Sequence, residues 1–178
     1  IMNNQAQNTS IPNDALTDTR DMLLMQPKYD SMKTILQVLP LLGSGGGVER
    51  GTIEIAEAIV EAGGRALVAS AGGSQVHEVK RAGGKHIQLP VNSKNPIIMY
   101  NNIRRLVDLI KIEKIDLVHV RSRAPAWSCL YATQKTRSPF ITTFHGTYSA
   151  NNFLKRSYNR VMTRGDRVIA ISNFIGEH

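Results

Sequence analysis

Short apolar runs alternate with segments of helical periodicity from residue 33 to the end of the chain, and this alternation limits the possible folds most. The apolar runs are 34–40, 66–70, 86–90, 116–121, 139–145 and 166–172. The helical segments between them are 48–62, 74–82, 96–114, 125–135 and 151–164. Strands that alternate with helices build a parallel sheet covered on both faces. The sequence therefore predicts an α/β, three-layer Rossmann-like domain with a mostly parallel sheet of about six strands.

Local signals fix the ends and buried faces of several helices. Ile55, Ile59 and Ala62 share one face of the first helical segment, which Gly63 and Gly64 terminate. Proline suits a first helical turn, so Pro96 is expected to open the segment 96–114. Its predicted buried stripe is Leu106, Leu109 and Ile110. Ser172 is expected to cap a further helix.

Residues 1–32 differ in composition from the rest and are predicted to form a mobile tail, ahead of a single domain at 33–178. No apolar run approaches the ~20 residues of a membrane span. There is no basic-then-apolar leader, so a cytoplasmic location is expected. The single cysteine, Cys129, excludes a disulfide framework within the chain and is expected to be a buried thiol.

The formal net charge of +8 is consistent with phosphates or anionic lipid as neighbours, or simply with solubility. Aromatic residues make up only 6%, and they do not interleave with basic residues, so no nucleic-acid partner is expected.

Polar residues follow the predicted strands. In open parallel sheets, ligands bind beyond the carboxyl ends of the strands. Here those ends carry glycines, hydroxyls, two arginines and a histidine, in segments 43–47, 70–74, 91–94, 121–123, 145–148 and 172–173. The sequence therefore predicts a binding site along one edge of the sheet.

The loop Gly-Ser-Gly-Gly-Gly at 43–47 lets a ligand approach the backbone at a helix N-terminus. No P-loop string is present. A dinucleotide site needs regular glycine spacing and an acid at the end of the second strand. Here Val48 and Arg50 interrupt the spacing, and the strand ends in Ala-Ser-Ala-Gly at 69–72, without an acid. A loop for a sugar, a diphosphate or an acceptor remains, beside the alternative of a tight turn without a ligand.

Four motifs, GGGVERG at 45–51, DLVHVR at 116–121, TFHGT at 143–147 and DRVIAISNF at 166–174, occur in this order on the expected elements. Together they resemble glycosyltransferase family 4. The resemblance implies the N-terminal half of a GT-B fold, in which two Rossmann-like domains face each other across a cleft. It also implies transfer of a hexosyl group with retained configuration, without a metal or cofactor. The donor would be a nucleotide-sugar, held mainly by a C-terminal domain absent from these 178 residues, so the chain alone is expected to be inactive.

The resemblance also assigns roles to residues. His145 is the candidate catalytic residue, which would face the reacting sugar. Gly45, Gly46 and Gly47 would lie against the diphosphate or the acceptor, whereas Glu49 is either a site residue or a helix-dipole partner. The further candidate substrate contacts are His119, Arg121, Ser122, Arg123, Gly146, Thr147, Ser172 and Asn173.

Alternatives stay open for several of these residues. His119 is either a substrate contact or a buried structural histidine, and His145 could also merely satisfy a strand end. Arg121 stands where the family has a second histidine and could form an anion clamp with Arg123, the alternative being solvated arginines.

Arg156, Arg160 and Arg164 recur at i, i+4 spacing in the segment 151–164, opposite Leu154, Tyr158 and Val161. Many relatives act on lipid-linked acceptors at the inner membrane in bacterial polysaccharide or lipopolysaccharide synthesis. This stripe therefore predicts peripheral contact with anionic lipid on the inner face of the plasma membrane, with a solvated face as the alternative. The other functions considered are a nicotinamide-dependent oxidoreductase domain and a non-catalytic anion-binding module.

Overall fold

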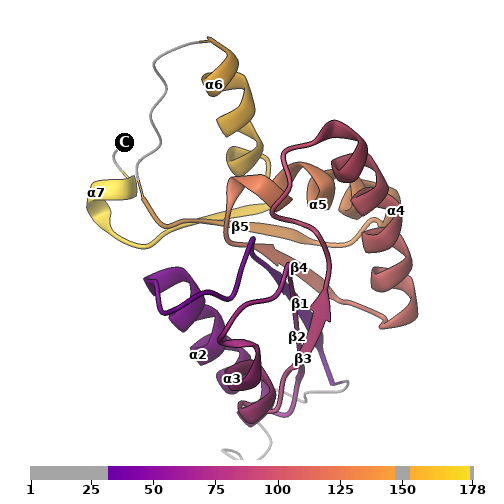
Figure 1. Cartoon of the computed structure of the whole chain (residues 1–178), viewed down its shortest axis with the longest axis vertical. Helices are drawn as coiled ribbons and strands as arrows, with labels where there is room; N and C mark the ends of the chain where they lie inside the picture. Colours follow the sequence, from indigo (N-terminus) through magenta and orange to yellow (C-terminus); the bar gives the residue numbers. More distant parts are fainter. Residues whose placement is uncertain (1–31, 147–152, 177–178) are drawn as a thin grey trace, which may run out of the picture. The chain divides into compact units, whose positions relative to one another are not determined.

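The computed structural model describes residues 32–146 and 153–176, which build one six-stranded sheet in the order β3-β2-β1-β4-β5-β6 (Figure 1). Its strands are β1 (Thr34–Val38), β2 (Arg65–Ser70), β3 (Lys85–Gln88), β4 (Leu117–Val120), β5 (Phe140–Phe144) and β6 (Arg167–Ala170). Every neighbouring pair is parallel. The predicted α/β class and strand number are confirmed.

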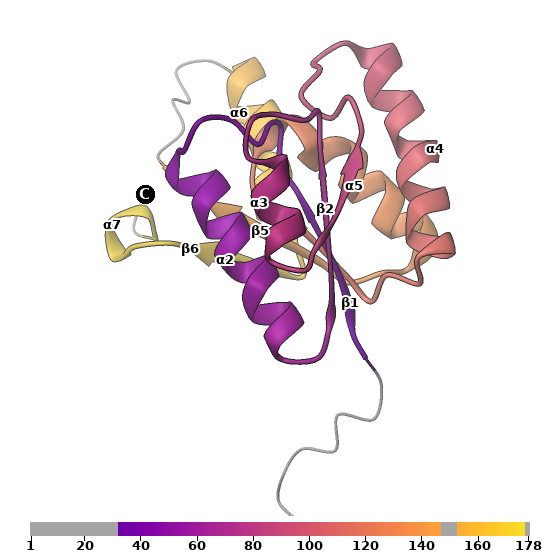
Figure 2. The same cartoon turned by 60° about the horizontal axis from the view of Figure 1, so that its bottom comes forward.

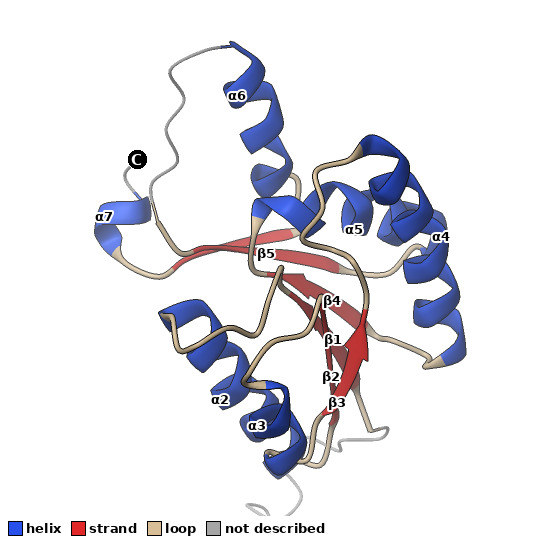
Figure 3. Ribbon diagram, in the orientation of Figure 1, coloured by secondary structure: helices blue, strands red, loops and turns tan. Residues whose placement is uncertain are grey.

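Helices cover both faces of the sheet. They are α2 (Gly47–Glu61), α3 (Val76–Arg81), α4 (Pro96–Ile112), α5 (Arg123–Thr136), α6 (Phe153–Asn159), the 3-10 helix η2 (Arg160–Thr163) and α7 (Asn173–Gly176). Figures 1 and 2 show α2 and α3 on one face and α4 and α5 on the other, with the sheet between them. Coloured by secondary structure, the same three layers are visible in Figure 3.

Side chains of strand β2 contribute to two hydrophobic cores, one on each face of the sheet. Successive side chains of a strand point to opposite faces. Leu67 and Ala69 belong to the core on the α4 and α5 side, whereas Ala66 and Val68 pack with Ala56 of α2. Because both faces are covered, the strand is an almost continuous apolar run.

Helix α4 begins where the sequence predicts. The Asn95 side chain caps it by accepting a hydrogen bond from the backbone N–H of Ile97 at 2.9 Å, and Pro96 is its first residue. Leu106 and Ile110 are buried in the core, and Leu109 packs against it. At the other end of the chain, the Ser172 hydroxyl accepts from the N–H of Ile175 in α7 at 3.4 Å, as expected of a cap.

The sequence places Ile55, Ile59 and Ala62 on one face of α2, and the structure buries this face only in part, because Ile59 packs against the core. The helix buries Thr52 and Ala56, whereas Ile55 is 37% exposed and Ala62 lies on the surface. Small side chains at the contact let α2 approach the sheet closely, and the Thr52 carbonyl oxygen accepts a hydrogen bond from the Gln37 side chain at 2.9 Å. Ile53 and Ile59 pack beside this contact at the edge of the core.

The helix predicted over 151–164 is present at Phe153–Thr163, but it is not one regular α-helix, and residues 151–152 lie outside the described residues. The α-helix ends at Asn159 and continues as the 3-10 helix η2. The tighter winding buries Val161 and Met162 completely, and the Thr142 hydroxyl donates to the Met162 carbonyl oxygen. None of the described helices combines the length and apolar character that crossing a bilayer requires.

Candidate substrate-binding site

Three neighbouring strands bring the predicted residues to one edge of the sheet. Strand β4 pairs with β1 on one side and with β5 on the other, all in parallel. The glycine loop 43–47 follows β1, Arg121 follows β4 and His145 follows β5. Their carboxyl ends therefore lie side by side. Thr147, a further predicted contact, falls outside the described residues.

Below this edge, the α2 face of β1, β4 and β5 is lined by polar side chains. Gln37, His119, Arg121 and Thr143 are all buried, at 0%, 7%, 5% and 3% exposure. They alternate with the apolar residues that face α4 and α5, so strand periodicity separates the polar set from that core. Buried polar groups of this kind need partners, and the contacts among them define the site.

His119 pairs with Thr143 across β4 and β5. Its Nε2 atom lies 2.6 Å from the Thr143 hydroxyl oxygen. Burial lowers the pKa of His119 to about 4, helped by the positive charge of Arg121 and by His145. The imidazole is therefore neutral at pH 7. His119 is buried and hydrogen-bonded, as the structural alternative for this residue predicts.

Arg121 ties strand β4 to β1 and α2. Its Nη1 atom donates to Gln37 Oε1 at 3.0 Å and to the Gly51 carbonyl oxygen at 3.1 Å. A Cβ atom at Gly51 would lie 2.9 Å from Arg121 Nη2, so the helix leaves room for the guanidinium only because this residue is glycine. The Nε atom of Arg121 is buried without a partner among the described residues.

Arg123 points to a different element. Its Nη1 atom donates to Asn159 Oδ1 of α6 at 2.7 Å, and Ser122 stands between the two arginines as the residue before α5. In the structure the two guanidinium groups hydrogen-bond different elements, Arg121 to β1 and α2 and Arg123 to α6, and their joint binding of an anion stays a prediction.

Glu49 lies over the glycine loop. A Cβ atom at Gly46 would be 2.5 Å from Glu49 Oε2, and one at Gly43 would be 3.7 Å from Oε1. The carboxylate, in the first turn of α2, thus occupies the space that glycines leave at the helix N-terminus, where negative charge is favoured. Gly47 meets nothing within 4 Å of such an atom, so its side of the loop is open.

His145 stands next to this loop, half-buried, and its Nε2 atom has no partner among the described residues. Burial lowers the pKa of His145 and Arg121 lowers it further, while the Glu49 carboxylate opposes the shift. A neutral imidazole has one nitrogen that donates and one that accepts, which suits a hydroxyl group. Space is open around Gly146, where an added Cβ would meet nothing within 4 Å.

Two predicted contacts lie elsewhere. Ser172 and Asn173 are exposed after β6, which is the outermost strand and is separated from β1 by β4 and β5.

Cys129 is buried, and burial raises the pKa of its thiol. Among residues 32–146 and 153–176, no group of His, Cys, Asp or Glu side chains is arranged to bind a metal.

The structure adds Gln75, which the sequence analysis passed over. Its Nε2 atom lies 3.5 Å from the position that a Cβ would take at Gly45. Gln75 is far from the glycine loop in sequence. The only signal was the Gly72-Gly73 pair just before it.

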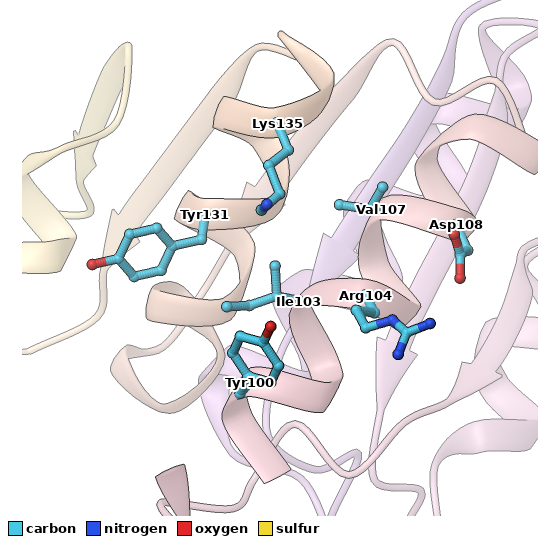
Figure 4. Close-up of a pocket in the computed structure, with 7 residues that line it drawn as sticks. All are labelled: Tyr100, Ile103, Arg104, Val107, Asp108, Tyr131 and Lys135. Carbon is cyan, nitrogen blue, oxygen red and sulfur yellow. The ribbon is translucent and has the colours of Figure 1, made fainter. Parts of the chain in front are cut away.

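A separate groove of about 520 Å³ lies between α4 and α5, on the other face of the sheet from α2 (Figure 4). Tyr100 and Ile103 of α4 and Tyr131 and Lys135 of α5 are among its lining residues. None of the predicted site residues lines this groove, so it is distinct from the edge described above.

Comparisons with known proteins identify the family and the fold. A model of the family described as Glycosyltransferase Family 4 matches residues 45–178. The structure of a glycosyltransferase from Rickettsia africae is 45% identical, with a TM-score of 0.72, over 83% of this chain and 39% of that one. MurG from Acinetobacter baumannii is 15% identical, with a TM-score of 0.57, over 78% of this chain and 41% of that one.

A putative UDP-N-acetylglucosamine 2-epimerase from Listeria monocytogenes is 11% identical, with a TM-score of 0.59, over 83% of this chain and 41% of that one. No curated protein sequence matches. The chain spans about two fifths of the length of these three solved structures.

Proposed function

Because the chain belongs to glycosyltransferase family 4 and has the fold of the N-terminal half of a GT-B enzyme, we propose that it is the acceptor side of a retaining glycosyltransferase. In the proposed reaction, the bond between the anomeric carbon of a hexose and a nucleoside diphosphate breaks. A new bond forms to an acceptor hydroxyl, and the proton of that hydroxyl passes to the departing nucleoside diphosphate. The acceptor class is a saccharide or a lipid-linked saccharide.

The observation that carries this proposal is the shared edge of the glycine loop and His145, with a polar sheet face beneath it. The loop lets a sugar approach the backbone closely. Next to it, His145 offers a neutral imidazole whose Nε2 has no partner among the described residues. We assign His145 to a hydroxyl of the reacting sugar or to the charge that develops in the transition state.

The donor is proposed to be a nucleotide-sugar held mainly by a second domain. The chain spans about two fifths of the length of these solved structures, which supports a second domain. The name of the 2-epimerase contains a nucleotide-sugar, which supports this class of donor. The nicotinamide alternative has no support at β2, where Ser70 ends the strand and contacts His86 Nε2 at 2.9 Å.

Ligand binding by the chain itself tests whether this domain binds the acceptor while the second domain binds the donor. We expect UDP-N-acetylglucosamine to bind the 178 residues more weakly than micromolar in calorimetry, with no turnover. Methyl glycosides at millimolar concentration should shift the backbone amide resonances of Gly45–Gly47 and Gly146. Micromolar donor affinity or sugar transfer by this chain alone would contradict the proposal.

Catalysis is tested by replacing the matching segment of the Rickettsia africae enzyme with this domain, which is 45% identical to it. In such a chimera, His145→Ala should lower sugar transfer about a hundredfold, the usual effect of removing one group that stabilises the transition state. His77→Ala, on the exposed side of α3, is the control. A chimera with His145→Ala that keeps near-normal turnover removes this residue from the mechanism.

We also propose a cytoplasmic protein that contacts anionic lipid peripherally. Lys155, Arg156 and Arg160 are exposed near Phe153, which is 81% exposed. Arg164, the third arginine of the predicted stripe, is also exposed, and its guanidinium carbon lies 5.9 Å from the centre of the Trp127 ring. Replacement of the three basic residues by glutamine should abolish co-sedimentation with phosphatidylglycerol vesicles, and unchanged binding would refute this contact.

A further inference from the structure

Arg121 is a buried cation whose hydrogen-bond acceptors are both neutral. Its side chain is 5% exposed, and its Nη1 atom donates to the Gln37 side-chain oxygen and to the Gly51 carbonyl oxygen. Its Nε atom has no acceptor among the described residues, and no ion pair in that part of the chain includes it. A guanidinium group stays protonated in proteins. The domain therefore holds an uncompensated positive charge at the carboxyl end of β4.

The stability of the fold does not account for this charge. Removing a charged group from water is costly unless a partner of opposite charge compensates for it, and a neutral side chain at position 121 would avoid that cost. The Glu54 carboxylate favours the charged form of Arg121 from a distance, but it is exposed and pairs with Arg50 at 2.9 Å. The reason for a cation here therefore lies with the other groups that it faces.

Arg121 faces the same side of the sheet as the candidate catalytic residue. Strands β4 and β5 pair in parallel, and the His119 imidazole contacts the Thr143 hydroxyl across this pair at 2.6 Å. Because successive side chains of a strand alternate between the two faces, Arg121 follows His119 on the α2 face and His145 follows Thr143. The buried charge and the His145 imidazole thus stand at neighbouring strand ends.

Two charges of opposite sign act on His145. Burial lowers the pKa of His145, the Arg121 charge lowers it further, and the Glu49 carboxylate in the first turn of α2 opposes both. His119 is the other titratable group beside them, and it is neutral at pH 7 because its pKa is about 4. Charges in a site shielded from water interact more strongly than in bulk solvent. The charge of Arg121 therefore bears directly on the protonation of His145.

The protonation state decides what His145 can do in the proposed reaction. A neutral imidazole has one nitrogen that accepts a hydrogen bond, whereas an imidazolium only donates. The Nε2 atom of His145 has no partner among the described residues. A neutral His145 can therefore accept the hydrogen of a sugar hydroxyl, and a protonated one cannot.

From these contacts we propose that Arg121 is a positioning residue, whose buried charge keeps the His145 imidazole neutral and able to accept a hydrogen bond from a sugar hydroxyl. This inference rests on the proposed function, because Arg121 acts through His145. It gives Arg121 a role that needs no contact with the substrate. The contacts with Gln37 of β1 and Gly51 of α2 fix the guanidinium, so its charge cannot move out into the solvent.

The first test follows the His145 imidazole of the 178-residue chain by NMR while the pH is varied. Its signal is the one that His145→Gln lacks. Arg121→Met and Arg121→Gln remove the charge, the second while keeping an N–H donor, and Arg121→Lys keeps the charge. Gln37→Leu is the matched control, because it breaks the contact of Arg121 with β1 and leaves the charge in place. Glu49→Gln removes the opposing charge.

We expect the midpoint of the His145 titration to rise in Arg121→Met and Arg121→Gln, towards the value of about 6.5 for an exposed imidazole. Arg121→Lys and Gln37→Leu should titrate like the wild type. Glu49→Gln should have a lower midpoint, because the carboxylate that favours the imidazolium is gone. Thermal unfolding of every variant identifies those that fold.

The second test measures sugar transfer by the chimera at about pH 6 and about pH 8. An imidazole with a midpoint of about 6.5 is mostly protonated at the lower pH and mostly neutral at the higher one. Arg121→Gln should therefore lose up to about fourfold more activity at the lower pH than at the higher one. A purely structural role of Arg121 would lower transfer by the same factor at both.

The outcomes separate the two proposals. An unchanged His145 titration in the variants that lack the charge, or a rise of the same size in Gln37→Leu, would overturn the role of Arg121 alone. Equal losses of transfer at both pH values would also overturn it. If the chimera with His145→Ala transfers sugar normally, the proposed role of His145 fails, and this inference fails with it whatever the titration shows.

Discussion

The Nε2 atom of His119 lies 2.6 Å from the hydroxyl oxygen of Thr143, across the pair of strands that ends at the candidate site. Burial lowers the pKa of His119 to about 4, against 6.5 for an exposed imidazole. The folded domain therefore keeps this imidazole neutral under conditions in which the unfolded chain protonates it.

This difference predicts a loss of stability in acid. Above pH 6.5 the contribution is fully present, and it is lost as the pH falls from 6.5 towards 4, because only the unfolded chain binds the proton. The expected decrease in the free energy of unfolding is about 3 kcal/mol. Urea unfolding at several pH values measures it. His119→Gln should reduce the dependence without removing it, because burial also lowers the pKa of His86 and of His145. His77→Gln, at an exposed histidine, is the control. Identical pH profiles for wild type and His119→Gln would contradict the assignment.

The contact between Arg121 and Gln37 predicts a second effect. Gln37→Leu leaves the buried Arg121 guanidinium without one of its acceptors and should lower the free energy of unfolding by about 2 kcal/mol. Arg50→Gln is the control, since the Arg50–Glu54 ion pair is exposed and its loss should cost less than about 0.5 kcal/mol. Chemical denaturation compares the two. Equal, small effects would show that the Gln37 contact does not hold β1 to β4.

Gly73 and Gly47 are expected to differ in their tolerance of a side chain. Gly73→Ala places a Cβ against the Leu42 carbonyl oxygen at a φ of 137° and should cost about 3 kcal/mol. Gly47→Ala meets nothing within 4 Å, and the free energy of unfolding should change by less than about 0.5 kcal/mol. Thermal unfolding measures both. A stable Gly73→Ala variant would mean that Gly73 does not lie against Leu42.

Local sequence patterns were sufficient to predict the strands of the sheet and the starts of two helices. The six strands, the start of α4 at Pro96 and the cap at Ser172 follow from properties of neighbouring residues, such as period-2 or period-3.6 hydrophobicity and the missing N–H of proline. The same local reasoning did not predict that α2 buries Thr52 and Ala56, nor that the helix within 151–164 changes to a 3-10 helix at Arg160. There the deciding contacts, Gln37 with Thr52 and Thr142 with Met162, join residues from different elements.

The amino-acid sequence alone determined that β1, β4 and β5 end in glycines, arginine and histidine, because the order of apolar and polar residues along a chain is a local property. Only the tertiary structure decided that Arg121 and Arg123 separate and that Gln75 meets Gly45. Side-chain direction at the end of a strand depends on which acceptors the neighbouring elements present. Those acceptors are fixed by strand pairing and by the contact of two loops, which no short segment of the chain encodes by itself.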